Sequence, residues 1–440
     1  MQKIVSLAKR RGFIFPGSEI YGGLANSWDF GPLGVELKNN IKQEWWRRFV
    51  QQRADVVGID AALLMNPKVW EASGHLKEFS DPLVECRQCH ERFRADQIDA
   101  KNPCPACKTE KSFTKEANFN LMLKTFLGPT EEKANIIYLR PELAQAMFVN
   151  FKNVLDTMHR RLPFGIASQG KAFRNEITPG NFIFRTREFD IMEFEYFVPE
   201  KEWEKWFAYW LGEMKRWLEH IGVDPAHIHD AEIPDGERAH YSKRTTDIEY
   251  DYPFGKKELY GLAYRTDFDL KNHMEKSGVD LTYTDESTGE SFVPHVIEPT
   301  FGLNRTVLVA MLEAYHEEEA PTAEEGESAT RVVMKFPAWL APVKVAILPL
   351  SKKGELTKVA KPLFETLSKQ FVCEYDETQS IGKRYRRQDE IGTIACVTVD
   401  FDTLQDNSVT IRDRDTMEQD RVSISQLSNV IAQKLDFVFS

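Results

Sequence analysis

The chain has 440 residues, a hydrophobic fraction of 42%, an aromatic fraction of 12% and a formal net charge of −11. This length predicts two or three domains with packed cores. The net negative charge excludes a protein that binds polyanions in general. Six cysteines are too few for a disulfide scaffold, and no apolar run is long enough to span a membrane, so we expect a cytoplasmic protein with no membrane partner.

The first third of the chain contains a predicted amphipathic helix over residues 35–50. Its apolar stripe repeats every four residues and consists of Leu37, Ile41, Trp45 and Phe49. Residues 56–67 are expected to form a strand that stops at Pro67. A further helix is expected over residues 140–156, with Pro141 in its first turn.

Four cysteines form two Cys-x-x-Cys pairs, Cys86 with Cys89 and Cys104 with Cys107. Two such pairs can present four thiolates to one tetrahedral Zn²⁺, in an insertion that we place at residues 85–110. A site closed by four sulfurs has no open position, so its role would be structural. Free buried thiols are the alternative.

Residues 171–197 are dense in charged and aromatic side chains and are expected to form an antiparallel hairpin that turns at Pro179-Gly180. On strands, Arg174 and Glu176 would share one face, as would Phe189, Glu193 and Glu195 on the return strand. Such a surface suits a nucleotide together with an amine. A solvated hairpin with cross-strand ion pairs fits the spacing equally well.

The rest of the chain divides near residue 340. Residues 200–221 carry a helical stripe of large apolar side chains that we assign to the core. Residues 293–315 read as a strand, a glycine turn and a helix, and residues 316–328 as an exposed acidic loop. From 341 onwards, strands alternate with helices over 355–369 and 424–435, which predicts a separate α/β domain.

Several motifs in this order resemble a known family. "FRNE", a loop and "RTREF" resemble motif 2 of the class II aminoacyl-tRNA synthetases, "GLNR" at 302–305 resembles motif 3, and the helix at 35–50 resembles motif 1. "RRGFIFPGSEIYGGLANSWDFGPLG", "SGHLKEFSDPLVEC", "YLRPELAQAMF", "AYRTDFDL" and "DFDTLQDNSVTIRDRDTMEQ" are similar to segments of the homodimeric type of glycyl-tRNA synthetases. The resemblance starts near Arg10, so no cleaved presequence is expected.

The resemblance implies an α+β fold. A class II antiparallel sheet flanked by helices would form a catalytic domain over 1–338, the zinc ribbon at 85–110 would be inserted in it, and an α/β anticodon-binding domain would occupy 339–440. The implied activity joins glycine to the 3′-terminal ribose of tRNA-Gly through a glycyl-adenylate made from ATP with Mg²⁺. The implied assembly is a homodimer. The alternative is a non-catalytic paralogue that binds RNA or has a regulatory role.

The resemblance also implies roles for single residues. The catalytic residues would be Arg174 on the α-phosphate, Glu176 beside it and Arg305 at the γ-phosphate end, while Phe189 would stack on adenine. Glu258 and Glu298 are candidate Mg²⁺ ligands. The implied ATP-binding residues are Arg174, Asn175, Glu176, Phe184, Arg185, Thr186, Arg187, Glu188, Phe189, Glu258, Leu259, Gly302, Leu303, Asn304 and Arg305.

Glycine offers only its ammonium group and its small size for recognition. The resemblance implies an acidic pocket for the ammonium group, formed by Glu142, Glu193 and Glu298. Larger amino acids would be excluded sterically. Thr300 stands where the family more often has serine. The implied glycine-binding residues are Arg94, Glu142, Phe189, Asp190, Ile191, Met192, Glu193, Glu298, Pro299, Thr300, Phe301 and Gly302, and Arg265 is a further candidate for the pocket wall.

A basic stretch in the C-terminal region is a candidate RNA contact. Lys383, Arg384, Arg386 and Arg387 surround Tyr385, which could stack on a base. The alternative is an ordinary solvated helix face.

Overall fold

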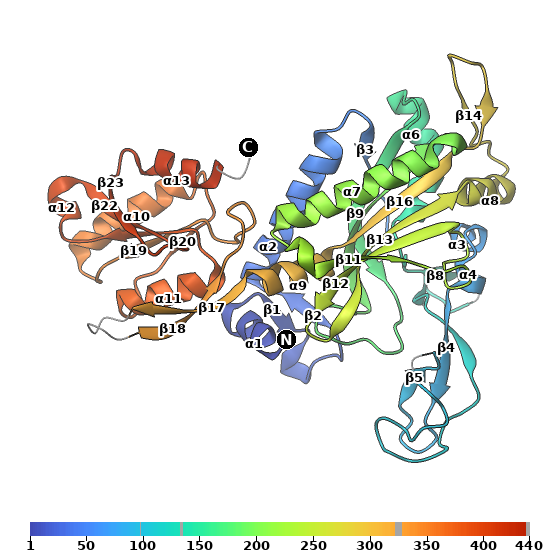
Figure 1. Cartoon of the computed structure of the whole chain (residues 1–440), viewed down its shortest axis with the longest axis horizontal. Coiled ribbons are helices and arrows are strands. Elements are labelled where there is room, and N and C mark those ends of the chain that lie inside the picture. The colour runs from blue at the N-terminus through green and yellow to red at the C-terminus, as the bar shows by residue number, and fades with distance from the viewer. Residues whose placement is uncertain (97, 133–134, 322–327, 437–440) are drawn as a thin grey trace.

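The computed structural model describes residues 1–96, 98–132, 135–321 and 328–436. A large lobe contains the main sheet, a smaller lobe contains the C-terminal residues, and a narrow ribbon projects from the large lobe (Figure 1). Within the described ranges, no helix combines the length and the apolar character needed to cross a membrane.

The large lobe is built on a seven-stranded sheet. Its strands, in spatial order, are β11 (Ile228–Glu232), β12 (Arg244–Tyr252), β13 (Gly255–Thr266), β16 (His295–Gly302), β10 (Glu188–Val198), β9 (Phe164–Phe173) and β3 (Val56–Gly58). All neighbours pair antiparallel except β3, which runs parallel to β9. The antiparallel sheet flanked by helices confirms the predicted fold class.

Alternate residues of β10 face two different layers, as the period of two for a strand requires. Met192, Phe194 and Tyr196 enter a core shared with α1 (Gln2–Arg11), α2 (Pro32–Trp46), α7 (Trp203–Ile221) and α9 (Leu303–Ala314). Ile191 and Phe197 enter a second core shared with α5 (Ala144–Val149), α6 (Phe151–Met158) and α8 (Phe268–Ser277). Glu193 and Glu195 therefore point into the second layer.

Two predicted helices of the first core are confirmed. Trp45 of α2 is fully buried, and Phe49 follows in a π-helical turn at Arg47–Gln51. The stripe on α7 is core, because Phe207, Trp210, Met214, Trp217 and Ile221 are all buried.

Two other predicted elements are shorter than expected. The strand predicted over 56–67 ends at Gly58, and Pro67 starts α3 (Pro67–Ala72) instead of ending a strand, because the Asn66 side chain accepts a hydrogen bond from the Lys68 N–H at 3.0 Å and caps that helix. The helix predicted over 140–156 begins only at Ala144 and is divided at Asn150 into α5 and α6.

The projecting ribbon begins at α4 (His75–Glu78). It contains a three-stranded sheet of β5 (Arg92–Arg94), β4 (Ser80–Glu85) and β6 (Ala117–Asn120). Three small hairpins complete the large lobe: β1 (Ile14–Pro16) with β2 (Trp28–Phe30), β7 (Lys124–Phe126) with β8 (Ile136–Tyr138), and β14 (Tyr283–Thr284) with β15 (Ser291–Phe292).

The acidic segment predicted as an exposed loop over 316–328 is partly strand. β17 (Tyr315–Pro321) pairs with β18 (Ser328–Met334), while residues 322–327 lie outside the described residues. Arg331 on β18 explains the pairing, because its buried guanidinium lies 2.6 Å from the Glu318 carboxylate and 3.5 Å from Asp389 in the small lobe.

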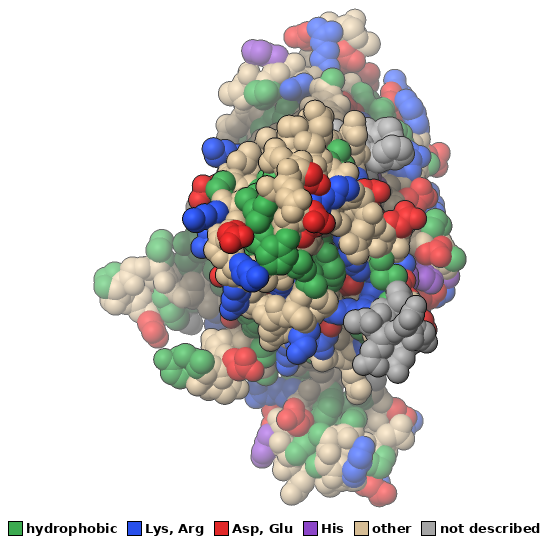
Figure 2. Space-filling view, turned by 90° about the vertical axis from the view of Figure 1, so that its left-hand side faces the viewer, with side chains coloured by type: hydrophobic (Ala, Val, Ile, Leu, Met, Phe, Trp, Pro, Cys, Tyr) green, Lys and Arg blue, Asp and Glu red, His purple; other side chains and the backbone are tan. Residues whose placement is uncertain are grey.

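The small lobe has the predicted alternation of strands and helices. Its sheet order is β20 (Cys373–Tyr375), β19 (Val345–Pro349), β21 (Ala395–Val399), β22 (Ser408–Asp413) and β23 (Gln419–Ser423). The helices are α10 (Gly354–Leu367), α11 (Ile381–Ile391), α12 (Thr403–Asp406) and α13 (Leu427–Asp436). Acidic and basic side chains intermingle on the face that this lobe presents in Figure 2.

Candidate active site and metal centre

The predicted hairpin exists, but its turn is longer than expected. β9 and β10 pair as far as Phe173 and Glu188, and the Arg174 N–H donates to the Arg187 carbonyl to close the ladder. Arg174 and Glu176 therefore lie in the loop 174–187 and do not share a strand face as predicted. The backbone N–H of Gly180 donates to the Arg185 carbonyl and that of Arg185 to the Gly180 carbonyl, so the chain reverses between these two residues. The turn therefore follows the predicted Pro179-Gly180 position.

Arg174 is fixed by the protein while its charge is left available. Its guanidinium lies 5.4 Å from the centre of the Phe79 ring and 5.5 Å from that of Phe189, and its Nε donates to the Pro141 carbonyl at 3.2 Å. Among the described residues, no acidic side chain pairs with it and its two Nη groups have no hydrogen-bond partner. The planar fork is thus oriented and free to bind an anion.

Most of the predicted ATP-binding residues surround one cavity of about 140 Å³, called here the first cavity. Its walls are formed by Arg174, Glu176, Ile183, Phe184, Arg185, Thr186, Phe189, Asp190, Ile191, Glu258, Leu259, Thr300, Gly302, Asn304 and Arg305. Four predicted residues lie outside these walls: Asn175, Arg187, Glu188 and Leu303. Of these, Glu188 forms an exposed ion pair with Lys171, and Leu303 is buried in the first core.

Arg305 closes one side of the first cavity. Its guanidinium lies 4.5 Å from the centre of the Phe184 ring, donates to the Glu258 carbonyl at 3.0 Å and forms an ion pair with the Glu258 carboxylate at 3.1 Å. The Arg305 charge holds the pKa of Glu258 below its usual range.

Asp247 is a second carboxylate near Glu258. A Cβ added at Gly261 would lie 3.7 Å from Asp247 Oδ1 and 3.9 Å from Glu258 Oε1, so both acids reach over the same glycine. Burial, together with repulsion from Glu258, raises the pKa of Asp247 to about 7. This pair of hard oxygen donors is what Mg²⁺ prefers.

A second cavity, of about 290 Å³, adjoins the first, because Arg174, Glu258 and Thr300 line both. The predicted acids Glu142, Glu193 and Glu298 lie in its walls. Its remaining lining residues, none of which was predicted, are Ile233, Glu237, Arg238, Ala239, Tyr241, Thr245, Asp247, Gly261, Leu262 and Ala263.

A buried ionic network forms the floor of the second cavity. The Arg265 guanidinium, which is fully buried, donates to Asp269 twice and to Glu298 once, each at 2.8 Å, and lies 3.6 Å from the centre of the Tyr241 ring. Arg265 is therefore part of the support beneath the pocket, since its hydrogen bonds are committed to these acids. Burial opposes the charged form of Arg265, but the carboxylates of Asp269, Glu298 and Glu142 outweigh it and keep its pKa above the usual range.

Glu142 belongs to the same network. His75 lies 3.2 Å from one of its oxygens, and Gln145 donates to the other at 3.0 Å. Burial opposes ionisation, but the charges of His75 and Arg265 and these hydrogen bonds outweigh it and lower the pKa of Glu142.

Glu193 lies in the wall of the second cavity. One of its oxygens accepts from the Thr300 hydroxyl at 2.8 Å and the other from the Leu143 N–H at 3.0 Å. Burial and the nearby Glu142 carboxylate raise the pKa of Glu193. Two oxygens held in place at the wall of a small cavity can accept hydrogen bonds from a cationic ligand.

Four predicted glycine-binding residues line neither cavity: Arg94, Met192, Pro299 and Phe301. Met192 and Phe301 are fully buried in the first core, because strand alternation turns them away from Glu193 and Thr300. Arg94 lies on β5 of the ribbon and pairs with Asp81 at 2.6 Å and Asp96 at 2.7 Å.

The unpredicted wall of the second cavity comes from residues 233–247 and from Gly261, Leu262 and Ala263 of β13. The first segment has no strong periodicity; its Asp247 meets the site because β12 and β13 pair, and its Tyr241 lies just before β12. The dense charge of "DGERAHYSKR" was the only signal in the sequence that could have drawn attention to it.

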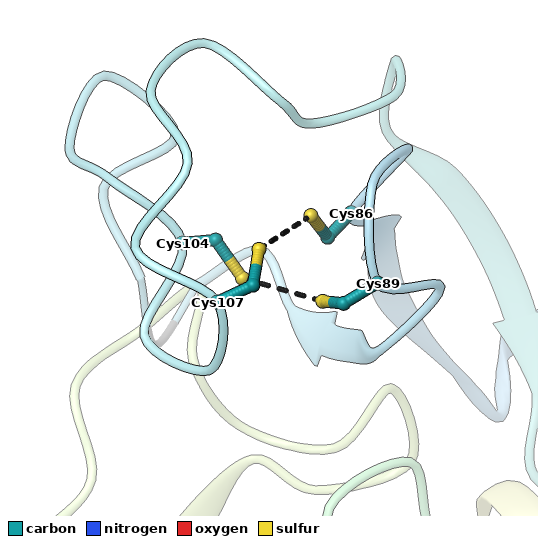
Figure 3. Close-up of side chains that lie close together, drawn as sticks. All are labelled: Cys86, Cys89, Cys104 and Cys107. Carbon is teal, nitrogen blue, oxygen red and sulfur yellow. Dashed lines mark hydrogen bonds between the residues drawn. The ribbon is translucent and has the colours of Figure 1, made fainter.

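The four predicted cysteines converge at the end of the ribbon (Figure 3). The sulfurs of Cys86 and Cys107 are 3.6 Å apart and those of Cys89 and Cys104 are 3.7 Å apart, and no disulfide joins them. Four sulfurs bound to one Zn²⁺ at about 2.3 Å would be about 3.8 Å apart. The donor set and its spacing therefore fit a closed zinc site. His90 turns aside to Glu85 at 3.2 Å.

The basic stretch of α11 is less available than its composition indicated. Arg384 is buried, and its guanidinium donates to the Pro349, Asp376 and Leu350 carbonyls. The Tyr385 hydroxyl bonds Thr398 at 2.6 Å. Both residues therefore hold the helix on the sheet, and the prediction that Arg384 adds to an exposed patch is wrong.

Comparison with known proteins agrees with this arrangement. Residues 126–315 match the family described as "tRNA synthetase class II core domain (G, H, P, S and T)", and residues 344–434 match "Anticodon binding domain". The chain is 53% identical to the glycine–tRNA ligase of Geobacillus thermodenitrificans (99% of this chain, 98% of the relative). It is 52% identical to that of Caldanaerobacter subterraneus (99% of both) and 50% identical to that of Thermobifida fusca (99% and 98%). The chain belongs to the glycine–tRNA ligase family of class II tRNA synthetases.

Proposed function

We propose that the chain is a glycine–tRNA ligase. It activates glycine with ATP to glycyl-adenylate and pyrophosphate, and then transfers glycine to the 3′-terminal ribose of tRNA-Gly. The observation that carries this proposal is the free guanidinium fork of Arg174 in the wall that joins the first cavity to the acidic second cavity.

Activation requires a glycine carboxylate to attack a phosphate that is itself negative. In the proposal, Arg174 holds the α-phosphate, where the fork neutralises charge as the new bond forms and pyrophosphate leaves. Arg305 holds the far end of the triphosphate, and Phe189 stacks on adenine. Positioning supplies most of the remaining acceleration, so no protein nucleophile is needed.

The site also suits Mg²⁺, which when bound would neutralise charge on the polyphosphate. Asp247 and Glu258 are the proposed ligands, because both carboxylates reach over Gly261 beside the first cavity. Glu298, the other candidate from the sequence, is less suited because Arg265 already donates to it.

The second cavity is proposed to hold glycine. Glu193 and Glu298 accept hydrogen bonds from the ammonium, while Glu142 contributes charge from a position fixed by His75 and Gln145. The Thr300 side chain lines both cavities and donates to Glu193, and in the proposal its bulk rejects a substituent on Cα. In the proposal, this combination selects the smallest amino acid.

The proposal extends to the remaining parts of the molecule. Residues 339–440 would bind the anticodon end of tRNA, with Lys383 and Arg386 beside a cavity of about 810 Å³. Residues 1–338 would form the catalytic domain, and residues 85–110 a ribbon held by structural Zn²⁺. A homodimer is supported by the exposed apolar side chains of Ile20, Tyr21 and Leu24. The setting would be the cytoplasm.

The test is ATP–pyrophosphate exchange with single amino acids. Exchange that depends on glycine, together with charging of tRNA-Gly, is the expected result. Exchange with alanine or serine but not glycine would reject the assignment, and no exchange with any amino acid would favour a non-catalytic paralogue. Sedimentation of the purified protein would test the dimer independently of activity.

A further inference from the structure

The two chain segments at the base of the projecting ribbon are attached to the loop that carries Arg174. The first segment, at Phe79, joins α4 to β4, and the second, at Leu121, follows β6 (Figure 1). The Leu121 N–H donates to the Phe79 carbonyl at 3.0 Å, and the Asn175 N–H donates to the Leu121 carbonyl at 2.8 Å. These backbone hydrogen bonds join both segments to the residue that follows Arg174.

The position of Phe79 is fixed from both sides by the base of the ribbon. Ser80, the next residue, pairs with Asn120 between β4 and β6. The Asn120 side chain donates to the His75 carbonyl at 3.1 Å and to the Leu76 carbonyl at 3.3 Å, which ties the start of α4 to β6. The centre of the Phe79 ring lies 5.3 Å from that of the His75 ring. Both the backbone and the ring of Phe79 are therefore held by the protein itself.

The Phe79 ring is one of three contacts that orient the Arg174 guanidinium. The other two are the Phe189 ring and the Pro141 carbonyl, which accepts from Nε at 3.2 Å. An aromatic face attracts a guanidinium without accepting a strong hydrogen bond from it, so the ring holds the planar fork and leaves its Nη donors available. A carboxylate in the same place would pair with the fork and compete with a phosphate.

The two rings differ in their relation to the cavities. Phe189 lines the first cavity, whereas Phe79 lines neither of the two. In the proposed function Phe189 stacks on adenine, so it is engaged by the ligand as well as by Arg174. Phe79 is therefore the ring that is placed to act on Arg174 and not on the substrate.

We propose that Phe79 is a positioning residue whose ring, held at the base of the ribbon, keeps the Arg174 guanidinium directed at the α-phosphate. The inference rests on the proposed function, because the orientation of Arg174 matters only if it binds that phosphate. A donor that is already in place stabilises the charge that develops in the transition state without further reorganisation. Loss of the ring should therefore lower kcat more than it changes the KM for either substrate.

The test compares Phe79→Leu, which keeps the apolar bulk but removes the aromatic face, with Phe79→Tyr, which keeps both. In ATP–pyrophosphate exchange, Phe79→Leu should lower kcat about 5- to 30-fold, as expected for the loss of a half-buried cation–π contact. The KM for ATP and the KM for glycine should stay within about threefold of the wild type. Phe79→Tyr should restore kcat to within twofold. Phe126→Leu, at an exposed residue of β7 that lines neither cavity, is the matched control and should leave exchange unchanged.

A double-mutant cycle tests whether the effect runs through Arg174. In a protein that already carries Arg174→Ala, Phe79→Leu should cause no further fall in exchange. Melting temperatures and zinc content of the same proteins identify any variant in which the ribbon itself has come apart.

Four results would overturn the proposal. A kcat within twofold of the wild type in Phe79→Leu would remove the ring from the support of Arg174, and equal losses in Phe79→Leu and Phe79→Tyr would assign a packing role. A KM for ATP that rises as much as kcat falls would place Phe79 against the nucleotide. Additive losses in the double mutant would assign the effect to another residue. A wild-type protein without glycine-dependent exchange would remove the proposed function at an earlier step, and this inference with it.

Discussion

Replacing Arg174 with alanine should separate catalysis from stability. Within the protein, the side chain makes one hydrogen bond, to the Pro141 carbonyl, and two ring contacts, with Phe79 and Phe189. Exposed cation–π contacts are worth about 0.5–1 kcal/mol each, and the 3.2 Å hydrogen bond, which is long for a charged donor, about 1 kcal/mol. The folded state should therefore lose only about 2–3 kcal/mol.

The catalytic loss should be much larger. The two free Nη groups can make two charged hydrogen bonds to phosphate, at about 1.5–3 kcal/mol each. A loss of about 3–6 kcal/mol in transition-state binding corresponds to a fall in kcat/KM of about 10²–10⁴. Arg174→Lys keeps the charge but not the planar fork, so we expect an intermediate value.

ATP–pyrophosphate exchange at saturating glycine measures this effect, with unfolding curves for the same proteins. Arg216→Ala, which removes an exposed arginine on α7, is the matched control and should leave exchange unchanged. If Arg174→Ala retained activity within tenfold of the wild type while remaining folded, the reasoning from its free guanidinium fork would be refuted.

Three further outcomes are expected. Cys107→Ser should lower zinc content from about one atom per chain and reduce the melting temperature; elemental analysis that finds full zinc occupancy in this variant would contradict the ribbon site. Trp45→Ala removes a buried ring packed among three phenylalanines and should cost about 3–5 kcal/mol in urea unfolding, whereas a loss below about 1 kcal/mol would not fit a close-packed core. Burial opposes ionisation of Glu44, but hydrogen bonds from His220 and Arg47 outweigh it and lower the pKa to about 2. Because the unfolded value is about 4.3, stability should fall as the pH drops from about 5 towards 2, and Glu44→Gln should flatten that part of the unfolding profile.

The parts of the fold that were predictable from the sequence are those with a strong local pattern. The stripe of α7 and the strand–glycine–helix order of β16 and α9 follow from periodicity and turn chemistry. The end of β3 at Gly58 was not predictable, because Pro67 is compatible both with the end of a strand and with the first turn of a capped helix. Only the capping bond from Asn66 decides between them.

The residues of the candidate site also fall into those that a local sequence pattern predicts and those that it does not. Arg174, Glu193 and Arg305 each lie in a contiguous motif, and they line two adjoining cavities, with Arg174 in the walls of both. Asp247 was missed because it reaches the site through pairing of β12 with β13, and Tyr241 because it lies in the segment before β12; no local spacing encodes either position. Arg384 was misjudged because a basic helix in sequence does not reveal that one of its arginines is buried and bonds three backbone carbonyls.

The most direct test of the central claim is a structure of the protein bound to a non-hydrolysable analogue of glycyl-adenylate. The account predicts that the phosphate of the analogue lies within hydrogen-bonding distance of the Arg174 Nη groups, while its ammonium group lies beside Glu193 and Glu298. An analogue bound elsewhere, or bound here with its ammonium directed away from these acids, would contradict it.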